Sequence, residues 1–210
     1  MNILTIDTVL NKTYVSVLLN NKEILKTIES DENNYHSAYL IKVLKDILKN
    51  ENSTLDCFDY IGTNTGVGSF TGIRVGLAVS KIISNRLNIK LVPLQTTEIL
   101  SKCYNNKNIM LDARRNSVFY SKDGKNIDMI SYDSAKEILA KSDENFICDN
   151  SFLKRFEEFK DKLISYETEN KDLSKVELEL TKEKIKNSEV LNWAELKPTY
   201  IQTPPIYSKN

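Results

Sequence analysis

The sequence predicts an α/β protein of two lobes, in which one order of strands and helices occurs twice. Three observations predict this class: short apolar runs rich in β-branched residues alternate with stretches of helical periodicity, their order recurs in the second half, and 210 residues suffice for two small cores. We therefore divide the chain into an N-terminal lobe over residues 1–100 and a second, degenerate lobe with a C-terminal tail over residues 101–210.

The first lobe is predicted to open with an antiparallel meander. Three apolar runs separated by short polar turns are the predicted strands, at residues 3–7, 14–19 and 22–28. From His36 to Lys49 apolar residues recur every three or four positions, which predicts a helix with one apolar face. A strand, a second helix and a fifth strand are predicted to follow, at residues 58–63, 70–86 and 89–93.

A second pass through the same order begins near Asn108. The predicted elements are strands at 109–112, 118–122 and 125–131, a helix at 134–141, a strand at 146–148 and a helix from about residue 151. The Glu- and Lys-rich stretch 165–187 is predicted to be a solvated helix packed on the second lobe, and three late prolines predict an extended tail. This order is typical of ribonuclease H-like lobes, and two such lobes form the actin-like ATPase (ASKHA) fold.

Composition excludes several classes of function. With 29 Lys plus Arg against 29 Asp plus Glu, the chain is not a basic protein that binds nucleic acid unaided. The three cysteines form neither a disulfide framework nor a CxxC pair, and the single histidine, His36, excludes a site that needs two imidazoles from one chain. The start does not resemble a signal peptide, and no apolar run approaches the roughly 20 residues that span a bilayer. We therefore expect a soluble, cytoplasmic protein without membrane association.

Five of the six glycines lie between residues 62 and 76. A predicted strand before them and a predicted helix after them are the context of a phosphate-binding loop. The lysine of a P-loop is missing, however, and the third glycine comes one residue later than the dinucleotide-binding pattern G-x-G-x-x-G requires. Ser69 is the predicted N-cap of the helix. Gly72 and Gly76 fall on one side of this helix, where each costs about 0.5–1 kcal/mol relative to alanine. A closely packed backbone is the expected compensation, either within the lobe or across a subunit interface, and the spacing leaves both open.

The segment at 66–78, GVGSFTGIRVGLA, resembles the GPGSFTGLRIGLA hallmark of the TsaB (YeaZ) family. These proteins are the non-catalytic subunits of the bacterial enzyme that makes tRNA N6-threonylcarbamoyladenosine. Other segments resemble the family in order along the chain: ILTIDT at 3–8, NYHSAYL at 34–40, LDARRNSVF at 111–119 and PTYIQ at 198–202. The chain departs from the family at Val67, Ser117 and Gln202, where the family has Pro, Glu and Arg.

The resemblance implies a scaffold or activator subunit with no catalysis, cofactor or metal of its own. It implies pairing with a TsaD-like catalytic subunit, joined by a TsaE-like ATPase, a homodimer when the protein is alone, and contact with tRNA through the assembled complex. It also implies a partner and dimer interface on the first two helices, comprising His36, Tyr39, Leu40, Val43, Phe70, Gly72, Arg74, Val75, Gly76 and Val79.

The residues themselves leave other classes to be weighed. An ATP-dependent small-molecule kinase of the same fold needs a glycine-containing turn after its first strand, and the turn at 7–12 has none, so we predict Asp7 to be a turn-capping or buried hydrogen-bonded carboxylate. A ribonuclease would need carboxylates such as Asp7, Asp59 and Asp112 to converge on two metal ions. A peptidase would need a metal site or an activated nucleophile, and no histidine is placed by sequence to activate a cysteine.

Overall fold

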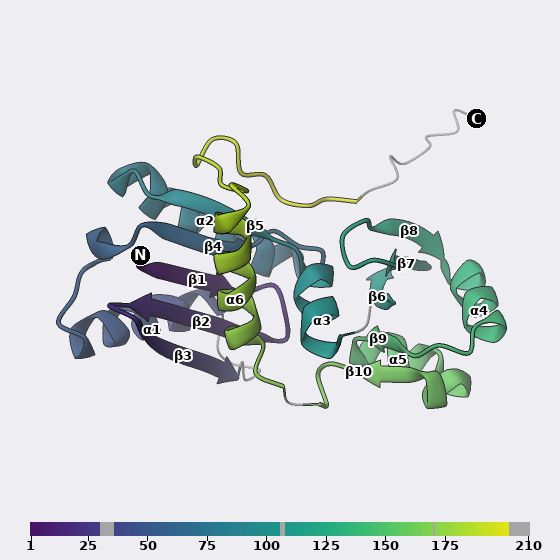
Figure 1. Ribbon diagram of the computed structural model, residues 1–210. Helices are drawn as coiled ribbons and strands as arrows, with labels where there is room; N and C mark the ends of the chain where they lie inside the picture. The colour runs from purple at the N-terminus through teal and green to yellow at the C-terminus, as the bar shows by residue number, and fades with distance from the viewer. Residues whose placement is uncertain (30–35, 106–107, 170, 202–210) are drawn as a thin grey trace.

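The computed structural model describes residues 1–29, 36–105, 108–169 and 171–201, with only the backbone of residues 28, 29 and 36–39. Two five-stranded sheets form two lobes (Figure 1). The first sheet has the order β3-β2-β1-β4-β5, in which β1 is antiparallel to β2 and parallel to β4. Its strands are β1 (Ile3–Asp7), β2 (Lys12–Leu19), β3 (Lys22–Glu29), β4 (Tyr60–Asn64) and β5 (Lys90–Leu94).

The second sheet repeats this arrangement around β6. Its order is β10-β9-β6-β7-β8, with β6 antiparallel to β7 and parallel to β9. Its strands are β6 (Ile109–Arg114), β7 (Ser117–Ser121), β8 (Asp128–Ser131), β9 (Phe146–Cys148) and β10 (Leu163–Ser165). The predicted repeat of two ribonuclease H-like lobes is therefore confirmed, although β10 was not predicted.

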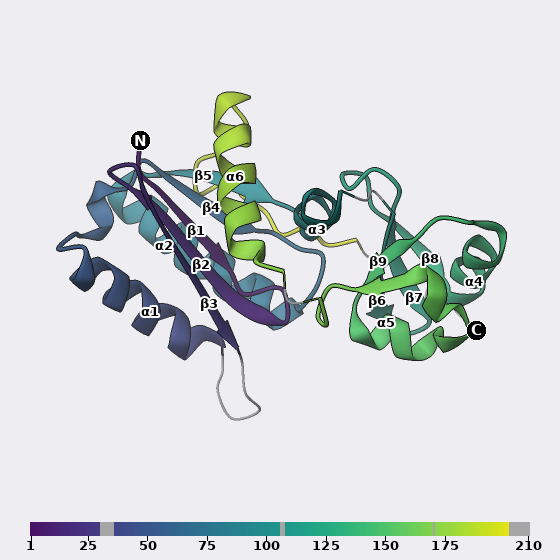
Figure 2. The same ribbon diagram turned by 60° about the horizontal axis from the view of Figure 1, so that its bottom comes forward.

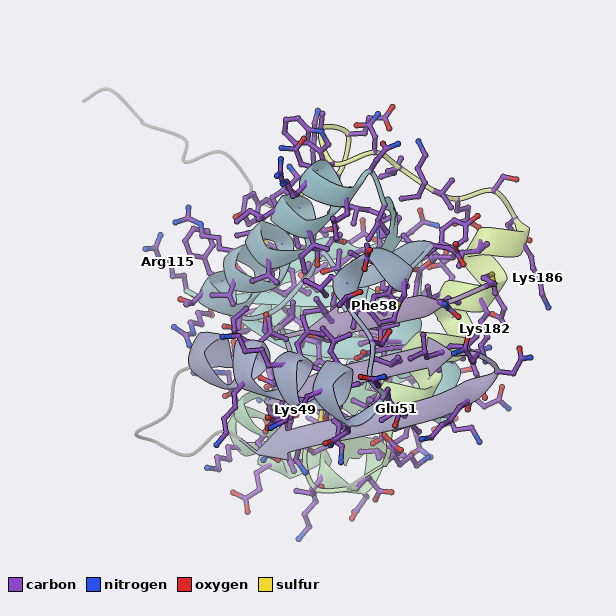
Figure 3. All side chains as sticks on the ribbon, turned by 90° about the vertical axis from the view of Figure 1, so that its left-hand side faces the viewer. Lys49, Glu51, Phe58, Arg115, Lys182 and Lys186 are labelled. Atoms are coloured by element: carbon purple, nitrogen blue, oxygen red, sulfur yellow. The ribbon has the colours of Figure 1, made fainter. Side chains whose placement is uncertain are left out.

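Helices cover both faces of the first sheet (Figure 2). α1 (His36–Asn50) and α2 (Phe70–Leu87) lie side by side on one face, and α6 (Leu173–Lys186) crosses the other. Figure 3 shows the same arrangement from the end of the lobe, with Lys49 of α1 and Lys182 of α6 on opposite sides of the sheet. α4 (Tyr132–Lys141) and α5 (Asn150–Arg155) belong to the second lobe, and short 3₁₀ helices occupy Leu55–Cys57 and Glu157–Lys162.

The position of α6 corrects the prediction for the Glu- and Lys-rich stretch. This helix packs on the first lobe, where Leu178 joins Ile3 and Leu18 in a buried cluster and the Ser16 hydroxyl donates to the Ser174 carbonyl at 2.6 Å. The reason is that α1 and α2 cover only one face of the first sheet and leave the other face to be covered. The chain therefore returns to the first lobe after residue 172, and the division at residue 100 does not hold for its C-terminal part.

α3 (Thr96–Tyr104) lies between the lobes and was also not predicted. It contacts α6 and also the strands β6 and β9 of the second sheet. The helix that ends the first lobe, α3, therefore lies at the junction of the lobes, and the helix that follows the second lobe, α6, packs on the first. After α6 the chain follows the first lobe, where Leu191 bridges to Leu91 and the Thr199 amide donates to the Thr65 carbonyl at 2.8 Å. No helix in the described ranges is long and apolar enough to cross a membrane.

Candidate functional site

The glycine-rich loop turns the chain from β4 into α2. Gly66 and Gly68 have φ angles of 112° and 147°, values that side chains rarely tolerate, so the loop can turn sharply at both positions. The Ser69 hydroxyl accepts a hydrogen bond from the Gly72 amide at 3.1 Å, which confirms the predicted N-cap. The loop and cap together fix where α2 begins.

Gly72 and Gly76 face inward, toward the turn after β1. A Cβ atom on Gly72 would lie 1.8 Å from the Thr8 carbonyl oxygen, and one on Gly76 would lie 3.0 Å from the Thr8 hydroxyl oxygen. That hydroxyl donates to the Gly72 carbonyl at 2.6 Å. The close contact that the two glycines permit is therefore within the lobe. Both are buried, so their assignment to a partner surface is corrected.

The other residues of the predicted interface divide between the core and the surface. Leu40 is fully buried in the core beneath α1, so it does not form a surface, whereas Val43 is half-buried at the edge of that core. On α2, Phe70 is 49% exposed, Arg74 is exposed, and Val75 and Val79 are half-buried. The side chains of His36 and Tyr39 lie outside the described residues.

Two exposed apolar residues on this face were not predicted. Ile82 of α2 is 68% exposed and Ile41 of α1 is 41% exposed. Phe70, Arg74, Ala78 and Ile82 are spaced four residues apart and are all exposed, so they form a stripe along the outside of α2. That spacing was visible in the sequence, but only the structure shows which side of α2 the sheet covers. We call Ile41, Phe70, Arg74, Val75, Val79 and Ile82 the outer face.

Aromatic contacts order the start of the outer face. The Arg74 guanidinium lies 3.8 Å from the centre of the Phe70 ring, and the Tyr200 ring of the tail lies 5.7 Å from the same ring. Such contacts restrict the rotamers of exposed side chains and lower the entropy lost when a partner binds. This end of the outer face is therefore preorganised.

The turn after β1 is closed by its own hydrogen bonds. One oxygen of Asp7 accepts from the amides of Val9 at 2.5 Å and Leu10 at 3.4 Å, and the other accepts from the Asn64 side chain at 2.7 Å. The Ser69 amide donates to the Val9 carbonyl at 3.3 Å, which joins the turn to the glycine-rich loop. The predicted role of Asp7 as a buried turn-capping carboxylate is confirmed. A phosphate would have to displace these bonds to reach the backbone amides.

A cleft with a volume of about 590 Å³ lies between the lobes. Among the described residues that line it, the second lobe contributes the carboxylates Asp112, Asp149 and Glu167 and the guanidinium of Arg114. Burial raises the pKa of Asp149 and of Glu167. Asp149 caps α5 by accepting from the Phe152 amide at 2.7 Å and also accepts from the Asp112 amide at 2.7 Å. These carboxylates accept hydrogen bonds from nearby backbone amides. Since they outnumber the positive charge beside them, they disfavour the binding of a polyphosphate on the second-lobe side of the cleft.

The candidate ribonuclease carboxylates lie apart. Asp59 lies immediately before β4, where it accepts from the Asn2 amide at 2.7 Å, whereas Asp7 is at the opposite end of the neighbouring parallel strand. Asp112 belongs to the second sheet and accepts from the Tyr132 hydroxyl at 2.7 Å. Among the described residues no three His, Cys, Asp or Glu side chains are grouped to hold a metal ion. Burial raises the thiol pKa of both Cys103 and Cys148, which opposes nucleophilic activity at neutral pH.

Two lobes with one strand order, joined across a cleft, define a protein of the actin-like ATPase class. The sequence model of the TsaD family, described as tRNA N6-adenosine threonylcarbamoyltransferase, matches residues 24–158. The chain belongs to this family and, within it, to the TsaB/YeaZ group that its motifs resemble.

Curated relatives carry the name tRNA threonylcarbamoyladenosine biosynthesis protein TsaB. The protein of Buchnera aphidicola subsp. Baizongia pistaciae is 29% identical over 144 residues, which are 65% of this chain and 64% of that protein. The protein of Haemophilus influenzae is 25% identical over 92 residues, which are 41% of this chain and 39% of that protein. The match therefore spans less than two thirds of the length of these relatives.

The solved structure of YeaZ from Pseudomonas aeruginosa has the same fold. It superposes with a TM-score of 0.76 over 95% of this chain and 99% of that chain, at 16% sequence identity. At this level of identity the likeness supports the two-lobe architecture alone.

Proposed function

We propose that this protein is a non-catalytic subunit in the biosynthesis of tRNA N6-threonylcarbamoyladenosine. It binds a TsaD-like catalytic subunit through the outer face of α1 and α2 and supports that partner's activity. In the absence of the partner, two copies pair through the same surface. A TsaE-like ATPase joins the complex, and tRNA is bound by the assembly in the cytoplasm rather than by this subunit alone.

The observation that carries the proposal is the exposed apolar stripe on α2. Ile82 exposes more of its surface than any other large apolar side chain among the described residues, and it lies two turns beyond Arg74 on the same helix. Large apolar side chains that gather on one helix face beside a second helix favour a protein partner over solvent. The names of the relatives, which refer to tRNA threonylcarbamoyladenosine biosynthesis, support the process in which that partner acts.

The residues of α2 would have different roles in the interface. Phe70, Val79 and Ile82 would supply the apolar area that is buried on association. Arg74, already held over the Phe70 ring, would supply a hydrogen bond at the rim. Gly72 and Gly76 act indirectly, because they set the depth at which α2 sits on the sheet and therefore the height of this face.

Size-exclusion chromatography with light scattering, alone and with the TsaD-like protein of the same organism, tests the proposal. We expect a homodimer that is replaced by a heteromeric complex when the partner is added. The absence of a complex under every nucleotide condition would contradict the proposal. Tight binding of ATP to the isolated chain, measured by calorimetry, would favour the kinase of the same fold instead.

The variant Ile82→Glu locates the interface. We expect at least about thirtyfold weaker association, which is the effect of losing a central apolar anchor, with an unchanged midpoint of thermal unfolding because the side chain is exposed. Lys186→Gln is the control, since it changes the net charge equally at an exposed position on α6, across the sheet (Figure 3). Equal weakening by both variants would show a general effect of charge and would contradict this location.

A further inference from the structure

Two carboxyl groups from distant parts of the chain meet in the interior of the first lobe. Asp7 ends β1, and Glu177 lies in the second turn of α6, on the helix that returns from the second lobe. Both side chains are fully buried, with 0% of their surface exposed. Neither residue belongs to the outer face, so the proposed function does not use this pair.

Hydrogen bonding distinguishes the two acids. Asp7 accepts three hydrogen bonds, from the amides of Val9 and Leu10 and from the side chain of Asn64. No donor among the described residues reaches either carboxyl oxygen of Glu177, whose hydrogen-bonding neighbour is the Asp7 carboxylate itself. Burial raises the pKa of Asp7 as well, but the hydrogen bonds from Asn64, Val9 and Leu10 oppose that rise. Donated hydrogen bonds stabilise an ionised carboxylate, so we assign the negative charge to Asp7 and the proton to Glu177. Burial first, and then the charge of Asp7, raise the pKa of Glu177 well above its usual range.

Within the part of the chain that the structure describes, the groups around the pair supply no compensating positive charge. Tyr14 from β2 interacts electrostatically with both acids and Tyr166, from the segment before α6, with Asp7, and burial raises the pKa of each hydroxyl. Asp172 at the start of α6 adds a further carboxylate near Glu177. Asn64 of β4 is neutral.

The nearby lysines are engaged elsewhere. Lys184, about two turns along α6 from Glu177, is paired with Glu98 of α3 at 2.9 Å and with Glu189 at 3.4 Å. Lys171 lies 4.0 Å from the centre of the Tyr104 ring of α3. A second negative charge beside Asp7 would therefore stand uncompensated.

α6 sits too close to the sheet for Glu177 to reach water while the helix is docked. On the same side of the helix, the Ser174 carbonyl accepts from Ser16 at 2.6 Å, one turn before Glu177. One turn after it, Thr181 packs against Gly62, where a Cβ atom would lie 2.3 Å from the Thr181 hydroxyl oxygen. Contacts on both sides fix the carboxyl in place, so its ionisation has to be met by movement of the helix.

We propose that Glu177 is a proton-dependent latch, which holds α6 on the first sheet while it is protonated and releases the helix when it ionises. The segment that leads into α6 is one of the two connections that join the lobes, and α3, which belongs to the other connection, packs against α6. Release of α6 would therefore loosen the seam beside the interlobe cleft, which gives the fold a response to pH that does not depend on the partner interface.

Hydrogen–deuterium exchange measured between pH 6 and pH 9 tests the latch. Between the ordinary pKa of a glutamate, about 4.3, and the raised pKa of Glu177, the docked helix holds one proton more than the released helix. Docking is therefore strongest at low pH, and within this pH range its equilibrium constant falls about tenfold for each unit by which the pH rises. After correction for intrinsic rates, we expect the protection of α6 amides to fall by this factor, while α1 amides on the opposite face keep their protection.

Glu177→Gln removes the ionisation and keeps a donor directed at Asp7. We expect its α6 protection to be independent of pH and at least about tenfold above that of the unaltered protein at pH 9. Glu179→Gln, at a half-buried position two residues along the helix, should follow the unaltered protein. Protection of α6 in the unaltered protein that does not change with pH would overturn the proposal, as would stabilisation by Mg²⁺ that Glu177→Gln abolishes, because the pair would then bind a cation.

Discussion

Gly72→Ala is expected to lower the free energy of unfolding by about 3 kcal/mol or more. Helix propensity alone predicts the opposite, because alanine is about 1 kcal/mol more favourable than glycine inside a helix. The added Cβ atom would lie 1.8 Å from the Thr8 carbonyl oxygen, so the turn after β1 or the whole of α2 has to move. Overpacking of a rigid backbone contact typically costs 1–3 kcal/mol and occasionally more. Urea unfolding followed by circular dichroism measures the difference.

Gly76→Ala is the matched control on the same face of the same helix. Its Cβ atom would meet the Thr8 hydroxyl at 3.0 Å, and a side chain can shift by a few tenths of an ångström. The gain in helix propensity and the cost of the tight contact then offset each other, so we expect the free energy of unfolding to change by no more than about 1 kcal/mol. A small change in the free energy of unfolding for Gly72→Ala would mean that the turn after β1 moves easily, which would contradict a rigid contact between Gly72 and the Thr8 carbonyl.

Asn64→Leu is expected to lower the free energy of unfolding by about 3–5 kcal/mol. Asn64 is 1% exposed and ties the ends of β1 and β4 to the start of α3. Its amide group donates to Asp7 at 2.7 Å and to the Thr96 hydroxyl at 3.1 Å, and its oxygen accepts from the Gly66 amide at 3.0 Å. Leucine keeps the number and branching of the side-chain heavy atoms but leaves a buried carboxylate and a buried amide without these partners, which is the costly way to break a network.

The same substitution at Asn126 shows what burial contributes. Asn126 also donates from its side chain to an aspartate, Asp123, at 2.5 Å, but both residues are exposed. Asn126→Leu is therefore expected to change stability by no more than about 0.5 kcal/mol. Chemical denaturation of both variants gives the comparison. If Asn64→Leu also cost less than 1 kcal/mol, water would have to replace the lost donors at Asp7.

Much of the candidate site followed from local sequence. The Ser69 cap and the buried role of Asp7 depend on residues a few positions apart, and the structure confirms both. Apolar periodicity predicted α1 and α2 within a residue or two at each end, because one face of each helix has to be buried whatever lies beneath it. The family motifs predicted the TsaB/YeaZ group.

β10 and α3 were not predicted, and α6 was predicted as a helix but placed on the wrong lobe, because the local signals of all three are weak or misleading. β10 has only three residues, and α3 has nine residues in which the apolar positions are few. α6 carries Glu177 and Lys184 on its buried side, so its sequence reads as a solvated helix. Each of these elements is held by partners far away along the chain, which no local pattern contains.

The sequence by itself determined the fold class, the order of nearly all strands and helices, the family, and the two helices proposed to carry the interface. Only the tertiary structure decided which side of those helices faces out, so that Ile41 and Ile82 replace Leu40, Gly72 and Gly76 on the outer face. It alone brought Glu177 beside Asp7, 170 positions earlier in the chain. The physical reason is that periodicity reports which residues need burial, whereas the packing of distant segments decides what buries them.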